Sequence, residues 1–402
     1  ASALAWLMMA SLTSSLDLSL EALLAAPAYG LAQAEKSALL MARLNALSEW
    51  HRQHSPEFAR ILDGYGWATA ADRYDDLPYL AVRLFKHLLL ASVPEEERFK
   101  TLTSSGTTGA VSRIVLDRQT AALQSKVLVK ILQEFIGKQR LPMLLVEQPA
   151  LIQNRSGFSA RGAGALGLSF LGRDHHYALD EQMQPNWPVI EAFCERYANQ
   201  PVLIFGFTFM VWQCLLEPLR ERGIQLPLAQ GILFHSGGWK KLQHLAVDNA
   251  AFKTRCQQQL GLSRVHNFYG MVEQVGSVFV ECEAGHLHAP VFADLLVRDP
   301  QTLAVQPVGE PGLLQVLSAL PQSYPGHSLL TEDLGDLKVV KSVPDRPNTF
   351  RAQTPQSFRF ATIRHAYDLA AADPDFHPTD DTRVVVDYLP DEPVAIVSGA
   401  ET

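Results

Sequence analysis

The stretch Thr101-Leu-Thr-Ser-Ser-Gly-Thr-Thr-Gly-Ala-Val-Ser-Arg-Ile-Val-Leu-Asp117 decides how the rest of the chain is interpreted. Its centre, Ser104 to Gly109, holds two glycines and four hydroxyl residues in six positions. Glycine lets a backbone approach a ligand closely, and successive backbone N–H groups with hydroxyl side chains form a concavity that suits phosphate oxygens. The sequence therefore predicts a phosphate-binding loop, with a flexible Ser/Gly/Thr linker as the alternative.

Composition bounds the classes of protein that need to be considered. With 402 residues, 47% hydrophobic and 19% charged, the chain is globular and long enough for two or three domains. The net charge is −8 and no basic stripe with interleaved aromatics occurs, so we expect no nucleic-acid partner. Four widely spaced cysteines without a C-x-x-C pair indicate neither a zinc site nor a disulfide framework.

The apolar runs do not predict a membrane protein. The longest run after the N-terminus, Pro201 to Trp212, is too short to span a bilayer. The first basic residue is Lys36, so the apolar start of the chain lacks the charged region of a secretory signal. We expect a soluble, cytoplasmic protein with reduced thiols and no transmembrane segment.

Helix-period and strand-period segments alternate after the loop, which is typical of α/β folds. Residues 1–100 are expected to be mostly helical, with Arg83 and Lys86 on a solvated face of the apolar segment 78–90. Residues 101–280 are expected to form an α/β core, residues 281–340 a β-rich subdomain, and residues 345–402 an atypical C-terminal segment. The predicted elements are helices at 37–50, 119–137, 187–198 and 209–222, the last broken at Pro218, and strands at 141–146, 201–207 and from 231; Gly172–Tyr177 is predicted to be a loop or pocket wall.

Four segments carry chemistry that suits a nucleotide, in the order 104–109, 236–238, 269–273 and 331–336. The Gly237-Gly238 turn lets a base lie against backbone, and Tyr269 offers a stacking face. Glu273 is a hard oxygen ligand of the kind that Mg²⁺ prefers, and Asp333 can accept two hydrogen bonds from ribose hydroxyls. Taken singly, each residue has a plain structural alternative: Tyr269 could be a core residue, Glu273 a surface carboxylate and Asp333 a turn residue. The hypothesis of a nucleotide site therefore depends on the order of the four segments.

This order resembles the adenylate-forming superfamily of acyl-CoA synthetases, adenylation domains and luciferases. The loop is similar to its Thr-Ser-Gly-Thr-Thr-Gly motif, and Tyr269 to Glu273 is similar to its Tyr-Gly-x-Thr-Glu motif, with Val272 at the usual threonine position. Leu330 to Asp333 resembles its Tyr-x-Thr-Gly-Asp motif, with the tyrosine and glycine replaced.

One branch, the LuxE-type acyl-protein synthetases, resembles the chain more closely over roughly residues 20–336. The likeness lies in 112–117, which ends the loop, in 78–85 and in 159–164. The likeness implies an α/β fold of layered mixed sheets and helices. It also implies that the protein converts a carboxylic acid, a long-chain fatty acid, to an acyl-adenylate with ATP. The acyl group would then pass to a protein thiol. The implied ATP-site residues are Ser104, Ser105, Gly106, Thr107, Thr108, Gly109, Ser236, Gly237, Gly238, Tyr269, Gly270 and Asp333, with Mg²⁺ on Glu273 and Arg113 neutralising phosphates or serving structure.

The resemblance changes after Asp336. The branch carries Cys-Pro-Cys-Gly, a lysine segment and an acyl-accepting cysteine there, and this chain has none of them. An acyl-CoA ligase and a non-catalytic nucleotide or acyl-adenylate binder are therefore kept as alternatives, the second because closure of a C-terminal lid supplies groups and excludes water in such enzymes.

The C-terminal tail resembles a different family, the methylerythritol phosphate cytidylyltransferases of the isoprenoid pathway. The similar segments are 351–356, 358–360, 379–381 and 388–391. The resemblance implies that Thr354 and Thr379 contact a sugar phosphate. Because the glycine-rich CTP loop of that family is absent, we expect a fused or retained fragment rather than a working cytidylyltransferase.

Overall fold

The computed structural model describes residues 18–104, 111–149, 167–239, 246–337, 360–371 and 381–390. The chain divides into two compact units, residues 1–337 and 338–402. The first unit contains three sheets, and the described part of the second contains two helices. None of the helices in the described ranges combines the length and the apolar character that crossing a bilayer requires.

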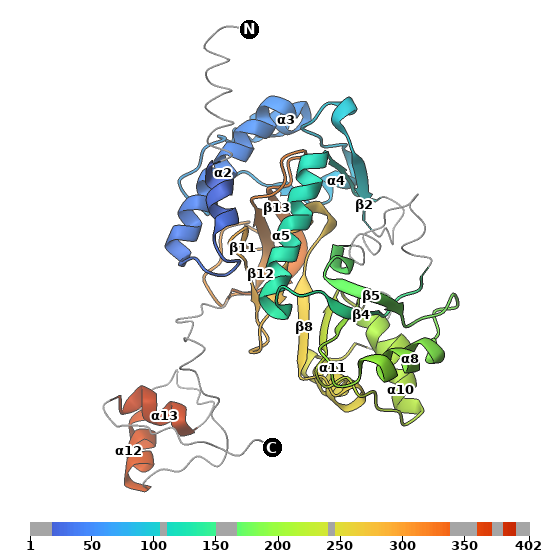
Figure 1. The fold of residues 1–402 in the computed structure, drawn as a ribbon. Helices are drawn as coiled ribbons and strands as arrows, with labels where there is room; N and C mark the ends of the chain where they lie inside the picture. Colours follow the sequence, from blue (N-terminus) through green and yellow to red (C-terminus); the bar gives the residue numbers. More distant parts are fainter. Residues whose placement is uncertain are drawn as a thin grey trace. The chain divides into compact units, whose positions relative to one another are not determined.

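A seven-stranded sheet forms the centre of the first unit (Figure 1). Its order is β10-β9-β8-β7-β6-β4-β5, and the run from β8 to β5 is parallel throughout. Because helices cover both faces of the middle of this run, its strands β4, β6 and β7 are almost continuously apolar. The strands are β4 (Leu141–Leu145), β5 (Gly172–Tyr177), β6 (Leu203–Phe207), β7 (Ile232–Ser236), β8 (Arg264–Tyr269), β9 (Phe279–Glu281) and β10 (Leu287–His288).

The two faces of this sheet pack against different helices, since successive side chains of a strand point to opposite faces. Met143 and Leu145 belong to a core shared with α2 (Gln33–His54) and α5 (Arg118–Ile136). Leu144 and Val146 belong to a core on the other face. The helices of that second core are α8 (Trp187–Tyr197), α9 (Thr208–Met210), the π-helical stretch Val211–Leu216, α10 (Glu217–Glu221) and α11 (Asn249–Leu260).

A second sheet has the order β1-β13-β12-β11 and is antiparallel except for β1 and β13. With the β2–β3 ribbon and α3 it encloses a third core around Phe58, Phe85 and Tyr324. The elements here are α3 (Pro56–Tyr65), β1 (Leu80–Ala81), α4 (Leu84–His87), β2 (Lys100–Thr103), β3 (Arg113–Leu116), β11 (Ala293–Arg298), β12 (Gly312–Ser318) and β13 (Ser328–Gly335).

Two sequence expectations about this unit are wrong. Gly172–Tyr177 is an edge strand, because it pairs in parallel with β4 although its own side chains are polar. The helical segment from Thr208 to Glu221 continues through Pro218, and the stretch directly before it, Val211–Leu216, is π-helical.

In the second unit, α12 (Phe360–Ala370) and α13 (Asp381–Tyr388) pack on each other through Ala366, Ala370, Val384 and Val385. The residues that carry the cytidylyltransferase resemblance, Thr354 and Thr379 among them, lie mostly outside the described ranges.

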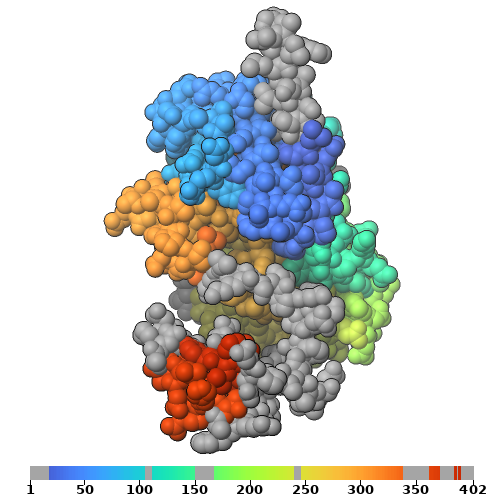
Figure 2. Space-filling model, turned by 90° about the vertical axis from the view of Figure 1, so that its left-hand side faces the viewer, coloured from blue at the N-terminus to red at the C-terminus, as the bar shows by residue number. Residues whose placement is uncertain are grey.

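The helix α2 is fixed to the loop between β12 and β13 by buried polar contacts. Arg43 Nε donates to the Ala319 carbonyl at 3.0 Å, and His51 bonds the Pro321 carbonyl through Nε2 at 3.1 Å and the Ser92 hydroxyl through Nδ1 at 2.7 Å. His327 stacks on His51 with ring centroids 5.0 Å apart. Figure 2 shows the N-terminal segment, in blue, lying against the β-rich segment, in orange.

The buried pair His51 and His327 should make the fold less stable at acid pH. Burial lowers the pKa of His327 to about 3 and holds the pKa of His51 well below its ordinary value. Both rings are therefore neutral in the folded state and take up protons on unfolding. The free energy of unfolding is expected to fall as the pH drops from about 6.5 toward 3, by up to about 1.4 kcal/mol per histidine and pH unit. Urea titrations at neutral pH and near pH 5 measure this loss.

A control variant separates the loss of stability caused by protonation of these two rings from the loss that acid causes elsewhere in the protein. His327→Asn removes one of the two titrating rings and should reduce the loss between the two pH values, whereas His286→Asn, at an exposed position, should not. An equal loss in wild type and in the His327 variant would contradict the assignment.

Candidate functional site

Two of the predicted segments begin where parallel strands end. The strands β6, β7 and β8 run in parallel and finish at Phe207, Ser236 and Tyr269. Ser236 pairs with Phe268, directly before Tyr269. Ligands of parallel sheets bind outside the carboxyl ends of the strands, so 236–238 and 269–273 share the edge of the sheet where a ligand is expected.

The predicted phosphate loop joins β2 to β3. Its base is closed by two hydrogen bonds, from Ser112 N to Ser104 Oγ at 2.9 Å and from Ser104 N to the Ser112 carbonyl at 3.2 Å. Arg113 begins β3 opposite Thr103 and its side chain is exposed. The described part of the chain therefore fixes both ends of the loop, whereas Ser105, Gly106, Thr107, Thr108 and Gly109 lie outside it, and their role remains a prediction.

Glu273 is the buried carboxylate of the site. It lies in the short 3-10 turn Val272–Gln274 after β8, and the Tyr324 hydroxyl donates to its carbonyl at 2.8 Å. The side chain is only 6% exposed, and this burial raises the pKa of the carboxyl group. The Ser112 hydroxyl and the Lys86 ammonium lie near the carboxylate and lower its pKa, while Asp333 raises it. Groups from the loop base, α4 and β13 thus act on the pKa of one carboxylate.

Tyr269 and Asp333 contact each other directly. The Tyr269 hydroxyl donates to Asp333 Oδ2 at 2.7 Å, which joins the end of β8 to β13. Burial, and next this bond to a carboxylate, raise the pKa of Tyr269. Asp333 N donates to Thr331 Oγ1 at 3.2 Å, which fixes the backbone before the carboxylate. Asp333 itself is exposed, so its second oxygen is accessible to a ligand.

The Gly-Gly turn after β7 is open and has a glycine-specific backbone. Gly237 has a φ of 80°, a conformation that residues with a Cβ rarely adopt. The Thr208 hydroxyl donates to the Ser236 carbonyl at 3.2 Å and fixes the start of the turn. Gly237 and Gly238 are exposed, as is Gly270 after β8, so their backbones are accessible to a planar group.

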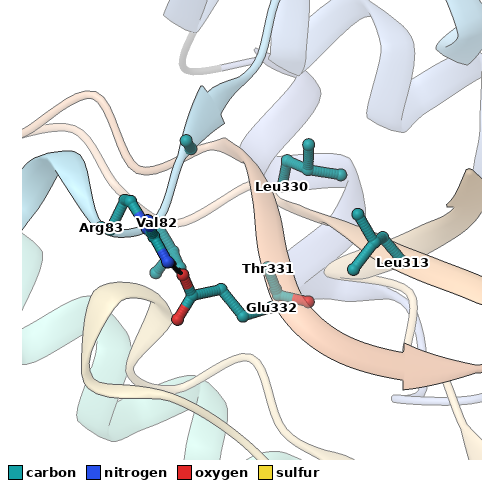
Figure 3. Close-up of a pocket in the computed structure, with 7 residues that line it drawn as sticks. Val82, Arg83, Leu313, Leu330, Thr331 and Glu332 are labelled. Carbon is teal, nitrogen blue, oxygen red and sulfur yellow. Dashed lines mark hydrogen bonds and ion pairs between the residues drawn. The ribbon is translucent and has the colours of Figure 1, made fainter. Parts of the chain in front are cut away.

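An open cavity of about 420 Å³ lies between β1, β12 and β13 (Figure 3). Its rim carries an ion pair between Arg83 and Glu332, and its wall is formed by Leu313, Leu330 and Thr331. Arg83 therefore pairs with the neighbour of Asp333 while its side chain stays exposed, which agrees with the expectation of a solvated face.

The residues fit a magnesium ion of the kind that is shared with a nucleotide. Among the described residues there is no group of three histidine, cysteine or acidic side chains that could hold a metal. Mg²⁺ at nucleotide sites is commonly held by one or two carboxylates together with substrate phosphates. Glu273 supplies one buried carboxylate beside the base of the loop, which suits that arrangement.

Sequence reasoning missed three residues of this site: Lys86, Ser112 and Thr331. Ser112 and Thr331 lie within the segments that the motifs marked, and only their hydrogen bonds give them a role. Lys86 directly follows the segment 78–85 that carries part of the LuxE resemblance, but nothing in its local sequence indicates that α4 lies near Glu273.

Comparisons with known proteins identify the family and the fold. A family model described as acyl-protein synthetase, LuxE, matches residues 9–348. The long-chain-fatty-acid–luciferin-component ligase of Aliivibrio fischeri is 24% identical over 280 residues, which are 67% of this chain and 71% of the relative. A crystal structure of 2-hydroxyisobutyryl-CoA ligase in an open conformation, with 2-HIB-AMP and CoA, has a TM-score of 0.58 at 18% identity and covers 77% of this chain and 73% of that one. The predicted adenylate-forming α/β fold is confirmed by this likeness.

A separate match accounts for the tail. The 2-C-methyl-D-erythritol 4-phosphate cytidylyltransferase of Thermobifida fusca (strain YX) is 51% identical over 73 residues, which are 18% of this chain. The chain spans only 29% of that enzyme's length. The predicted resemblance of the tail to this family is therefore confirmed as a resemblance to a fragment.

Proposed function

The chain belongs to the LuxE family of acyl-protein synthetases, and from this membership we propose that it activates a long-chain fatty acid with ATP and passes the acyl group to a protein thiol. The observation that supports the proposal best is the set of groups around Glu273. The base of the hydroxyl-rich loop, the end of β8 and the carboxylate of β13 all lie beside this one side chain.

The chemistry has two steps. A fatty-acid carboxylate oxygen attacks the α-phosphorus of ATP, and the bond from that phosphorus to pyrophosphate breaks, leaving an acyl-adenylate. A thiolate of the acceptor protein then attacks the acyl carbon, and AMP leaves. Catalysis of the first step needs little covalent participation from the protein, because positioning and electrostatic stabilisation lower its barrier.

The site residues named above each have a role in this scheme. Asp333 accepts hydrogen bonds from the ribose, the ring of Tyr269 lies against the base, and Gly237, Gly238 and Gly270 give the base access to the backbone. Ser104 holds the start of the phosphate loop, whose residues 105–109 orient the phosphates. Glu273 would hold Mg²⁺, which neutralises phosphate charge when bound. Arg113, exposed at the end of the loop, adds a guanidinium that matches phosphate geometry.

ATP–pyrophosphate exchange tests the first step. The full chain with Mg²⁺, ATP and a panel of fatty acids is expected to incorporate radiolabelled pyrophosphate into ATP, and only when a fatty acid is present. Tight ATP binding without exchange would instead make the chain a non-catalytic nucleotide binder. Transfer of the label from a radioactive fatty acid to protein, rather than to CoA, then distinguishes an acyl-protein synthetase from an acyl-CoA ligase.

A further inference from the structure

The turn after β7 has a backbone conformation that glycine permits but does not select. Gly237 has a φ of 80°, whereas glycine adopts positive and negative φ about equally readily. The conformation of the turn therefore depends on the groups that hold the peptide unit between Ser236 and Gly237.

Thr208, which begins α9, holds this peptide unit. Its hydroxyl donates to the Ser236 carbonyl at 3.2 Å. Because a peptide unit is planar, a fixed carbonyl also fixes the direction of the Gly237 N–H and thereby limits the φ of Gly237. Thr208 is buried, so water has little access to this bond.

His235 contacts the same hydroxyl. Its Nδ1 lies 2.9 Å from Thr208 Oγ1. A threonine hydroxyl carries a single proton, and in this arrangement that proton is donated to the Ser236 carbonyl. The hydroxyl therefore accepts from His235, so that Nδ1 is the protonated nitrogen of the ring. Burial lowers the pKa of His235 to about 3, which keeps the ring neutral at neutral pH.

The ring of His235 is in turn held by α11. Phe252 of that helix packs against the ring with centroids 4.4 Å apart, and the His235 side chain is buried. Its other nitrogen, Nε2, has no hydrogen-bond partner among the residues that the structure describes. The polar contact that orients this ring is therefore directed at the hydroxyl that fixes the turn.

From these contacts we propose that His235 and Thr208 are positioning residues of the nucleotide site, which hold the Ser236–Gly237 peptide unit in the conformation that receives the base. The inference rests on the proposed function, which assigns the base to this turn, and it adds two residues that lie outside the four motif segments. A turn that already has its binding conformation loses less conformational freedom when a ligand binds. The pair should therefore raise the affinity for a nucleotide through the turn rather than by direct contact.

Equilibrium binding of AMP to the full chain tests the proposal. Thr208→Val keeps the shape of the side chain and removes its hydroxyl, and it is expected to weaken AMP binding about tenfold, the scale of one buried hydrogen bond. Thr208→Ser keeps the hydroxyl and should bind AMP nearly as tightly as wild type. His235→Phe should cause a loss similar to that of Thr208→Val. The double variant should lose little more than either single variant, because both changes remove the same constraint.

His266→Phe is the matched control, because it also replaces a buried histidine of the same sheet. His266 lies on β8 and bonds the Glu281 carbonyl of β9 through Nδ1 at 2.9 Å. Urea titrations should show a loss of stability in this variant as well as in Thr208→Val and His235→Phe. The affinity for AMP should fall only in the Thr208 and His235 variants.

Each other outcome overturns the proposal. Unchanged AMP binding in Thr208→Val removes the role of the hydroxyl, and an equal loss in His266→Phe indicates a general loosening of the sheet. Additive losses in the double variant make the two residues independent of each other, and a wild-type chain that binds no AMP has no nucleotide site to position. The binding assay does not require turnover. Selective loss of AMP affinity in a chain that shows no pyrophosphate exchange would therefore uphold the role of His235 and Thr208 while the proposed acyl activation fails.

Discussion

Glu273→Gln is expected to lower the rate of Mg²⁺-dependent ATP–pyrophosphate exchange at least about a hundredfold, the scale on which supporting changes at metal sites act. The substitution keeps the shape of the side chain and removes its charge, so a metal shared with phosphates loses its carboxylate ligand. The fold should survive, because the turn is held by backbone and neighbouring contacts: the Tyr324 hydroxyl bonds the Glu273 carbonyl, and Gln274 Nε2 bonds the carbonyls of Val316 and Gly326.

A matched variant isolates this effect. Glu332→Gln removes an exposed carboxylate that pairs with Arg83, and such surface pairs contribute only about 0–1 kcal/mol. It should exchange nearly as fast as wild type, and both variants should melt cooperatively. If Glu273→Gln exchanges at the wild-type rate over a range of Mg²⁺ concentrations, Glu273 is not part of the site.

Asp333→Ala should raise the KM for ATP by roughly thirtyfold and change the maximal rate much less. Its carboxylate would accept hydrogen bonds from the ribose hydroxyls, and a thirtyfold change corresponds to about 2 kcal/mol, within the roughly 1.5–3 kcal/mol net that a hydrogen bond to a charged group contributes. Steady-state exchange kinetics measure both constants. Tyr269→Phe, which removes only the hydroxyl that donates to Asp333, should raise the KM by a smaller factor.

A nucleotide analogue makes this second test specific. With 2′,3′-dideoxy-ATP there are no ribose hydroxyls to bind, so wild type and Asp333→Ala should have similar KM values. If the variant is impaired equally with ATP and with the analogue, the carboxylate acts on the fold or on another part of the nucleotide, and the ribose assignment is wrong.

The central sheet could be predicted from the sequence because burial on both faces leaves a simple pattern. The strands at 141–145, 203–207 and 232–236 are apolar runs, and each was expected within two residues of its bounds. The strand β5 was missed because an edge strand needs no apolar faces, and its polar residues are typical of loops. Its parallel pairing with β4 is decided by the neighbouring strand, not by its own side chains.

The candidate site was predictable only where a motif marked it. Tyr269, Glu273 and Asp333 lie in the segments that the family resemblance indicated, and the LuxE resemblance itself is confirmed. Their roles, like those of the loop residues 105–109, remain predictions. The proximity of Lys86 to Glu273 could not be predicted, because it depends on the pairing of β1 with β13. These segments are about 250 residues apart in the sequence, and local periodicity carries no information about such pairing.

The bond between Tyr269 and Asp333 links two sheets, since β8 belongs to the seven-stranded sheet and β13 to the four-stranded one. A nucleotide bound by both side chains would add a second link between these two sheets. By thermodynamic linkage, ATP at a hundred times its dissociation constant would then add about 2.7 kcal/mol to the free energy of unfolding. The free energy of unfolding of the nucleotide-free chain would accordingly be lower than that of the nucleotide-bound chain.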